Sequence, residues 1–112
     1  MFVFVTQDLM ILSSARSVLP PGAVLKQAVS VQRLRELVIE NEIRLLLVDL
    51  QTPGLELDDL DQFLTESGLL SITVVFAQHV NVEILQQAKG RFPNVMTRGR
   101  FNAKLPNLLM DA

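Results

Sequence analysis

An unbroken apolar run at the centre of the chain, residues 45–48, most limits the folds open to this sequence. A strand exposed on one side alternates apolar and polar residues, whereas a continuous run is typical of a strand buried on both faces of a parallel sheet. The run ends at Asp49, and Pro53 and Gly54 follow in the next loop. The sequence therefore predicts a carboxylate at the edge where open α/β sheets bind ligands. A turn or helix cap is the alternative use of Asp49.

Two apolar spacings alternate along the rest of the chain. Short runs rich in β-branched and aromatic residues predict strands at residues 2–5, 23–29, 43–50, 72–76 and about 94–97. Apolar residues three or four positions apart predict helices that begin after Asp8, after Ser30, at Asp58 or Asp59, after Asn81 and at Phe101. Pro106 predicts that the last helix is short or broken. This alternation indicates one α/β domain over residues 1–112, with a single doubly wound parallel sheet.

Composition excludes several kinds of site. The sequence has no Cys, which excludes disulfides and thiolate metal sites and fits a reducing interior, so we expect a cytoplasmic protein. His79 is the only histidine, which excludes a multi-histidine metal cluster. The apolar opening, residues 1–5, is too short for a signal peptide or a membrane span, and we expect no membrane association.

Charge is distributed unevenly along the chain. The net charge of −2 argues against a general nucleic-acid binder. An acidic block without Lys or Arg comprises Glu56, Asp58, Asp59, Asp61 and Glu66. A basic segment without acidic residues comprises Lys89, Arg91, Arg98, Arg100 and Lys104. Two opposed patches of this kind either steer a partner or a second copy of the chain, or are ordinary solvated surfaces.

The segment 48–54, VDLQTPG, resembles the phosphoacceptor motif of response-regulator receiver domains, in which Asp is followed by an apolar residue, a variable residue, Met, Pro and Gly. The resemblance extends over nearly the whole chain. It implies a flavodoxin-like, CheY-like fold with strand order 2-1-3-4-5. It also implies that Asp49 is the phosphoacceptor and that the backbone carbonyl of Gln51 contacts the metal, with Thr52 where Met is common.

The other receiver positions depart from the family pattern. Thr6 and Gln7 stand where receivers have two acids that hold Mg²⁺, Ala77 replaces a Thr or Ser, and Arg98 replaces a Lys. Asp8 falls one position late and is better used as a helix cap. Asp8 and Asp49 are thus weak metal candidates, because Mg²⁺ needs several oxygen ligands in octahedral geometry. Arg98 is a candidate to pair directly with Asp49.

No other chemistry of this fold class is suggested by the sequence. Gln51 stands where a haloacid-dehalogenase type phosphatase has its second Asp, and no Gly-x-Gly-x-x-Gly or serine elbow follows any strand. We therefore expect a stand-alone pseudo-receiver that is not an enzyme, has no cofactor and acts as a protein-protein interaction module in signal transduction. The alternative is an atypical receiver that is phosphorylated on Asp49 and uses Mg²⁺.

The resemblance also implies an interaction face formed by the fourth helix, fifth strand and fifth helix. A basic rim around apolar residues there suits an acidic partner surface or an isologous homodimer. The candidate interface residues are Lys89, Arg91, Arg100, Lys104, Leu105 and Leu108. At least half of the leucines are expected to cover the sheet instead. Nucleic acid is a less favoured partner, because only Phe92 and Phe101 are available to stack on bases.

Overall fold

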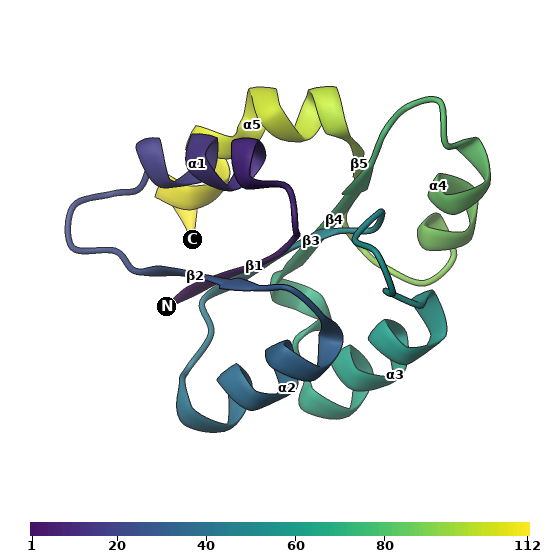
Figure 1. The fold of residues 1–112 in the computed structure, drawn as a ribbon, viewed down its shortest axis with the longest axis horizontal. Helices are drawn as coiled ribbons and strands as arrows, with labels where there is room; N and C mark the ends of the chain where they lie inside the picture. The colour runs from purple at the N-terminus through teal and green to yellow at the C-terminus, as the bar shows by residue number, and fades with distance from the viewer.

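A five-stranded parallel sheet forms the centre of the computed structural model, which describes residues 1–112 (Figure 1). The strands are β1 (Phe2–Val5), β2 (Leu25–Ala28), β3 (Leu45–Asp49), β4 (Thr73–Ala77) and β5 (Val95–Thr97). Their order is β2-β1-β3-β4-β5, which confirms the predicted topology. Every residue of β1, β3 and β4 is buried, whereas β2 and β5 form the partly exposed edges.

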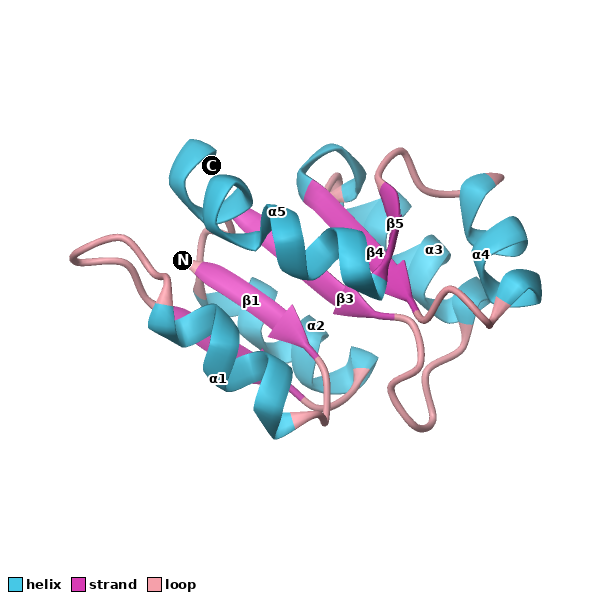
Figure 2. Cartoon of the chain, turned by 90° about the horizontal axis from the view of Figure 1, so that it is seen from above, coloured by secondary structure: helices cyan, strands magenta, loops and turns pink.

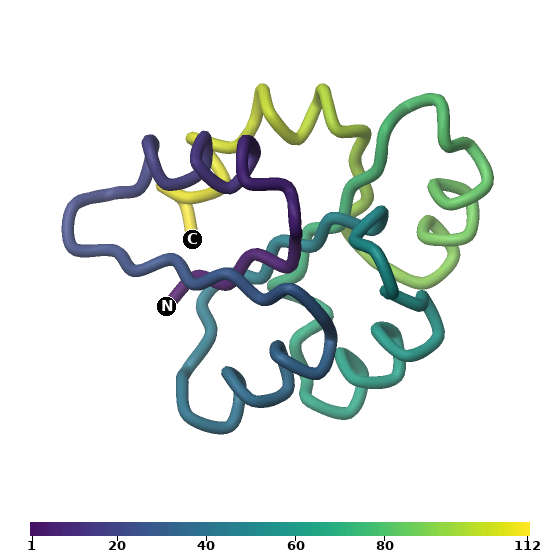
Figure 3. Tube along the Cα trace, in the orientation of Figure 1, coloured from purple at the N-terminus to yellow at the C-terminus, as the bar shows by residue number.

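Helices cover both faces of this sheet, as expected for a doubly wound fold (Figures 1 and 2). The helices are α1 (Leu9–Ser17), α2 (Val31–Glu40), α3 (Leu57–Ser67), α4 (Val82–Lys89) and α5 (Arg98–Asp111), with a short 3-10 turn η1 at Leu70–Ile72. The trace in Figure 3 shows α1 and α5 on one face, with α2 and α3 on the other. No helix is both long and apolar enough to cross a membrane.

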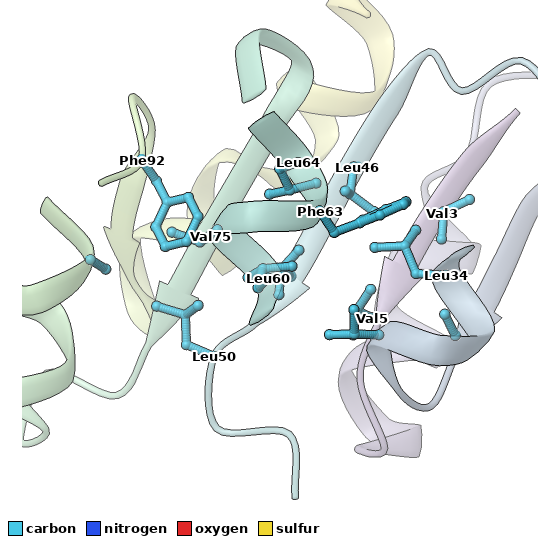
Figure 4. Close-up of a cluster of buried hydrophobic side chains, with 14 of the residues drawn as sticks. Val3, Val5, Leu34, Leu46, Leu50, Leu60, Phe63, Leu64, Val75 and Phe92 are labelled. Atoms are coloured by element: carbon cyan, nitrogen blue, oxygen red, sulfur yellow. The ribbon is translucent and has the colours of Figure 1, made fainter. Parts of the chain in front are cut away.

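The sheet separates two hydrophobic cores. Eighteen buried residues lie between the sheet and α2, α3 and α4, where Leu60 and Leu64 of α3 pack toward Leu46 and Val75 (Figure 4). Thirteen lie between the sheet and α1 and α5. Two-sided burial explains why the apolar run of β3 has no polar interruption.

Three phenylalanines organise the core beneath α5. The Phe76 and Phe101 rings stack with centroids 4.1 Å apart, and Phe4 meets both rings edge-on at 5.9 and 5.7 Å. Aromatic pairs in these arrangements contribute about 0.5–1.5 kcal/mol beyond the area they bury. Phe101 therefore anchors the first half of α5 to the sheet.

Three helices begin where their sequence signals predict, whereas α3 and α5 begin earlier. Helix α5 starts at Arg98, behind the cap residue Thr97, and not at the predicted Phe101. Asp8, Ser30 and Asn81 cap α1, α2 and α4 with their side chains, as predicted. Helix α3 instead begins at Leu57, behind Glu56, whose side chain makes no capping hydrogen bond. The predicted start at Asp58 or Asp59 is one or two residues late. Those carboxylates lie in the first turn and form ion pairs with Arg91 and Arg35.

The prediction of a short last helix is wrong, because α5 is the longest helix, with 14 residues. Proline lacks the N–H that would bond to the carbonyl four residues earlier. Pro106 and Asn102 are both exposed, so water reaches the carbonyl that Pro106 leaves free. Phe101, Leu105 and Leu109 are buried at four-residue spacing on the side of α5 that faces the sheet, and they hold the helix to the sheet.

Candidate functional site

Asp49 lies at the carboxyl end of the central strand, as predicted, and only 6% of its surface is exposed. One carboxylate oxygen, Oδ2, is 3.2 Å from the Thr6 hydroxyl, which donates to it. The other, Oδ1, accepts a hydrogen bond from the backbone N–H of Gln51 at 3.0 Å. A buried carboxylate costs free energy unless it is hydrogen-bonded, and these two neutral donors supply that stabilisation.

Thr6, which follows β1, is completely buried. Its hydroxyl oxygen accepts from the backbone N–H of Asp8 at 3.0 Å while the hydroxyl donates to Asp49. Gln27 of the edge strand β2 donates to the Thr6 carbonyl at 2.9 Å. Thr6 therefore joins the carboxylate to the start of α1 without adding a charge.

Arg98 pairs with Asp8 and not with Asp49. Its Nη2 is 2.5 Å from Asp8 Oδ2, and about 30% of each side chain is exposed. Asp8 Oδ1 also accepts from the N–H groups of Met10 and Ile11, as an N-cap. The expected pair between Arg98 and Asp49 is therefore wrong. Asp8 is nearer to the first turn of α5 and offers a partly hydrated carboxylate, whereas Asp49 is already hydrogen-bonded inside the sheet edge.

The ion pair shifts the titration of Asp8. The hydrogen bond from the Arg98 guanidinium is the main cause that holds the pKa of Asp8 below its ordinary value of 3.8, and the N–H groups of Ile11 and Met10 act in the same direction. Partial burial opposes the shift. Asp8 is therefore a charged partner of Arg98 at neutral pH.

Three glutamines connect the loops around this site. Gln78 N–H, after β4, donates to the side-chain carbonyl of Gln51, after β3, at 2.6 Å. Gln7, after β1, donates through Nε2 to the carbonyls of Val29 at 3.1 Å and Pro53 at 3.4 Å. These neutral hydrogen bonds tie the loops after four strands together at one edge of the sheet.

The turn after Asp49 has a fixed shape. The Thr52 hydroxyl donates to the Asp49 carbonyl at 2.6 Å and is buried, so the residue in the usual Met position acts as a turn clamp. Gly54 has φ +82°, a left-handed conformation that side chains disfavour. The Pro-Gly pair of the motif therefore serves the loop geometry.

A hollow of about 370 Å³ opens above Asp49. Its lining residues are Gln7, Asp8, Asp49, Gln51, Pro53, Gln78 and Arg98. Thr6 and Ala77, two of the predicted degenerate positions, do not line it. Ala77 is fully buried in the core shared with α2, α3 and α4 and has no hydroxyl to offer a ligand.

The donor set at this hollow does not fit Mg²⁺. Mg²⁺ in proteins takes oxygen ligands in near-ideal octahedral geometry, usually with more than one carboxylate free to bind. Asp8 is engaged by Arg98 and two backbone N–H groups, which leaves Asp49 as the available carboxylate. No group of three or more acidic, His or Cys side chains in the molecule is placed to hold a metal ion.

The cations of the predicted interface fall into two groups. Lys89, Arg100 and Lys104 are exposed and make no ion pair. Arg91 turns away from them and pairs with Asp58 of the acidic block, with Asp61 at 3.9 Å. The acidic block and the basic segment therefore touch at Arg91 instead of forming two opposed patches.

One of the two leucines of the predicted interface covers the sheet. Leu105 is 3% exposed and belongs to the core beneath α5, whereas Leu108 is half-buried and lines a separate hollow of about 530 Å³. The expectation that at least half of these leucines cover the sheet is confirmed, because Leu105 is a core residue.

Sequence reasoning missed the side chains of Gln51 and Gln78. A signal was present, since a glutamine follows the ends of β1, β3 and β4 within two residues. Carboxyl ends of parallel strands meet at one edge, so these amides were bound to lie near one another. Which amide bonds to which loop depends on side-chain rotamers and was not accessible from spacing.

Comparisons with known proteins show a similar fold but no significantly similar sequence among family models and curated proteins. No family model matches the chain, and no curated protein has a significantly similar sequence. The crystal structure of the receiver domain of NtrX from Brucella abortus matches with a TM-score of 0.75 and 16% identity over 100% of both chains. A longer NtrX structure from the same organism matches with a TM-score of 0.73 and 17% identity, over 98% of this chain but only 27% of that one. The chain has the flavodoxin-like, CheY-like fold of a response-regulator receiver domain.

Proposed function

We propose that this chain is a pseudo-receiver: a protein-protein interaction module in signal transduction that is not switched by Mg²⁺-dependent phosphorylation of Asp49. Its similarity in fold to the NtrX receiver domain supports a signalling context. The observation that carries the proposal is the pairing of Asp8 with Arg98 beside a neutral Thr6, which leaves Asp49 as the one unpaired carboxylate of the hollow.

The chemistry of phosphoryl transfer explains why this arrangement is unfavourable. Transfer to a carboxylate brings two anionic groups together, and metal ions and fixed cations normally neutralise the charge that develops. Here the one cation that lines the hollow, Arg98, is neutralised by Asp8. Ala77 provides no hydroxyl for a phosphoryl oxygen, and a hydrogen bond to a charged group is worth about 1.5–3 kcal/mol. A phosphoryl group on Asp49 would therefore be poorly stabilised.

The loop connections support a site of constant shape. The Gln51 side chain accepts from the Gln78 N–H at 2.6 Å, and this hydrogen bond joins the loop after β3 to the loop after β4. We infer that the module presents one surface to its partner and is regulated by availability of the partner, without enzymatic activity or a cofactor.

An NMR titration tests the proposal. A ¹H–¹⁵N spectrum is recorded with Mg²⁺ at millimolar concentration and then with added beryllofluoride, which mimics a phosphoryl group on Asp. We expect the amides of Asp49, Ala77 and Arg98 to keep their chemical shifts. Saturable shifts that disappear in Asp49→Asn would overturn the proposal and establish the alternative, an atypical receiver that uses Asp49.

A further inference from the structure

Strand β5, at the open edge of the sheet, lies between α4 and α5 (Figure 2). Residues of these three elements line a groove. Strand β5 pairs with β4 alone, and its three residues are only half-buried. The Asn94 carbonyl accepts from Val75 N–H at 2.9 Å, so Val95, the next residue, directs its backbone groups toward the unpaired edge. A groove of about 690 Å³ runs along this edge and is lined by all of β5. We call it the basic groove.

Unpaired positive charge surrounds the basic groove. Lys89 comes from the end of α4, and Arg100 and Lys104 lie one turn apart on α5. None of the three forms an ion pair, and no acidic residue lines the groove. Charges left unpaired in this way favour a partner that brings carboxylates.

Apolar surface continues from the basic groove toward α5. Asn94, Met96 and Lys104 line both this groove and the neighbouring hollow of about 530 Å³. Val95 packs on the side of α2, α3 and α4, and Met96 on the side of α1 and α5, so apolar contacts are available on both sides of β5. A strand laid beside β5 sends alternate side chains toward these two sides.

The charge pattern argues against a second copy of the chain in the same groove. A two-fold interface places the same patch of both subunits together. The cations Lys89, Arg100 and Lys104 would then lie close to the same cations of the second copy. Like charges that face one another across an interface weaken binding. Of the two occupants that a basic rim allows, the acidic partner is favoured.

A nucleic acid fits the basic groove less well. Single-stranded nucleic acids bind to grooves that combine cations with exposed aromatic rings. Phe92 and Phe101, the aromatic residues of this region, are 4% and 0% exposed and are not available to stack on bases. The net charge of −2 also disfavours binding to phosphates.

We propose that the basic groove binds an extended acidic segment of a partner protein, which adds a strand beside β5 and places its carboxylates against Lys89, Arg100 and Lys104. This inference rests on the proposed function and names the class of partner. Main-chain hydrogen bonds to the edge supply part of the affinity, and alternate side chains supply the specificity. Cations that guard an edge strand against neutral strands also select an acidic one.

A peptide titration on the ¹⁵N-labelled chain tests this proposal. The probe is a short blocked peptide that alternates glutamate and valine. Its controls are a lysine-valine peptide of the same length and a glutamate-valine peptide with N-methylated backbone amides. We expect saturable chemical-shift changes at Val95, Met96 and Thr97 with the acidic peptide only. The affinity of this peptide should fall by about tenfold when the salt concentration is raised from about 0.02 to 0.3 M.

Charge-reversal variants assign the binding to the groove. The double variant Arg100→Glu and Lys104→Glu is expected to lower the affinity for the acidic peptide by at least about tenfold. Lys26→Glu on β2, an exposed cation without an ion pair at the opposite edge of the sheet, is the matched control and is expected to change affinity by less than about twofold.

Three outcomes would overturn strand addition by an acidic segment. They are an acidic peptide that causes no shifts at millimolar concentration, equal binding of the N-methylated or lysine peptide, and a single-stranded oligonucleotide that displaces the acidic peptide. None of these changes the response to Mg²⁺ and beryllofluoride on the same sample. Failure of this proposal is therefore distinguishable from failure of the pseudo-receiver function.

Discussion

Arg98 and Asp8 are 90 positions apart in the chain, yet the Arg98 guanidinium reaches the Asp8 carboxylate at 2.5 Å. The contact joins the first turn of α5 to the N-cap of α1 above the carboxyl ends of the strands. The carboxylate that pairs with Arg98 is that of Asp8, and not that of Asp49. Asp49 and Arg98 are therefore not paired in this chain.

The Arg98–Asp8 pair predicts a component of acid sensitivity. Because the pKa of Asp8 is lowered in the folded chain, its contribution to stability is complete above the ordinary value of 3.8 and is lost as pH falls through the lowered pKa. Asp8→Asn keeps a good N-cap residue but removes the charge. We expect Asp8→Asn to cost about 0.5–1 kcal/mol at pH 7, the range of a partly exposed ion pair, and progressively less as pH falls below 3.8 and Asp8 is protonated. Urea unfolding at a series of pH values from 7 downward measures this loss.

A double-mutant cycle isolates the pair in this prediction. Arg98→Ala and the double variant with Asp8→Asn are unfolded under the same conditions. The coupling energy should vanish in about 1 M salt, which screens exposed charges. A coupling energy that is absent at pH 7 in low salt would show that the two side chains are not energetically paired.

The Gln51–Gln78 hydrogen bond predicts local protection of the loop after β4. Gln51→Ala removes the acceptor of the Gln78 N–H while leaving the backbone of the turn in place. We expect the Gln78 amide to exchange with solvent at least about tenfold faster, with a loss of global stability of about 0.5–1.5 kcal/mol or less. Hydrogen exchange followed by NMR measures both quantities.

Gln86→Ala is a matched control for this measurement, since Gln86 is exposed on α4 and makes no side-chain hydrogen bond. Its amide exchange pattern should equal that of the unmodified chain. Unchanged exchange at Gln78 in Gln51→Ala would mean that the loop is held by other contacts and that the glutamine connection is not a restraint.

Pro106 predicts a stabilising substitution. Pro106→Ala restores an N–H donor to the carbonyl of Asn102 inside α5, where proline costs about 3 kcal/mol relative to alanine. The greater freedom of the unfolded alanine variant offsets up to about 1 kcal/mol of that gain. We expect a net gain of about 1–2 kcal/mol in urea unfolding. Asn107→Ala, at a neighbouring exposed position, should gain no more than about 0.7 kcal/mol, and a destabilised Pro106→Ala would contradict the account.

The strands and caps were accessible from the sequence because their causes are local. The run at residues 45–48 reflects burial on both faces, and Asp8, Ser30 and Asn81 each cap the helix that begins immediately after them. Strand order came from resemblance to receivers, since many sheet orders are compatible with the same alternation of elements.

The choice among partners was not accessible from the sequence. Asp8 and Asp49 both precede helices at one edge of the sheet, and only the three-dimensional path of Arg98 decides which one it meets. The length of α5 was predicted wrongly for a related reason. The local free-energy cost of Pro106 predicts a break in the helix, but the burial of Phe101 and Leu109 on either side of it outweighs that cost.

Introducing acids near Asp49 predicts a new Mg²⁺ site. Thr6 is fully buried and its hydroxyl lies 3.2 Å from Asp49, so Thr6→Asp with Gln7→Asp brings carboxylates together and should cost about 3 kcal/mol without metal. Mg²⁺ binds the folded state only, so a concentration 100-fold above its Kd should raise the free energy of unfolding by about 2.7 kcal/mol.

The unmodified chain should respond to MgCl₂ no more than to NaCl of equal ionic strength. Gln7→Asp alone, at an exposed position, keeps the test valid if the double variant does not fold, since it should show a weaker Mg²⁺ response. A Mg²⁺-specific rise in the thermal midpoint of the unmodified chain would contradict the metal-free site.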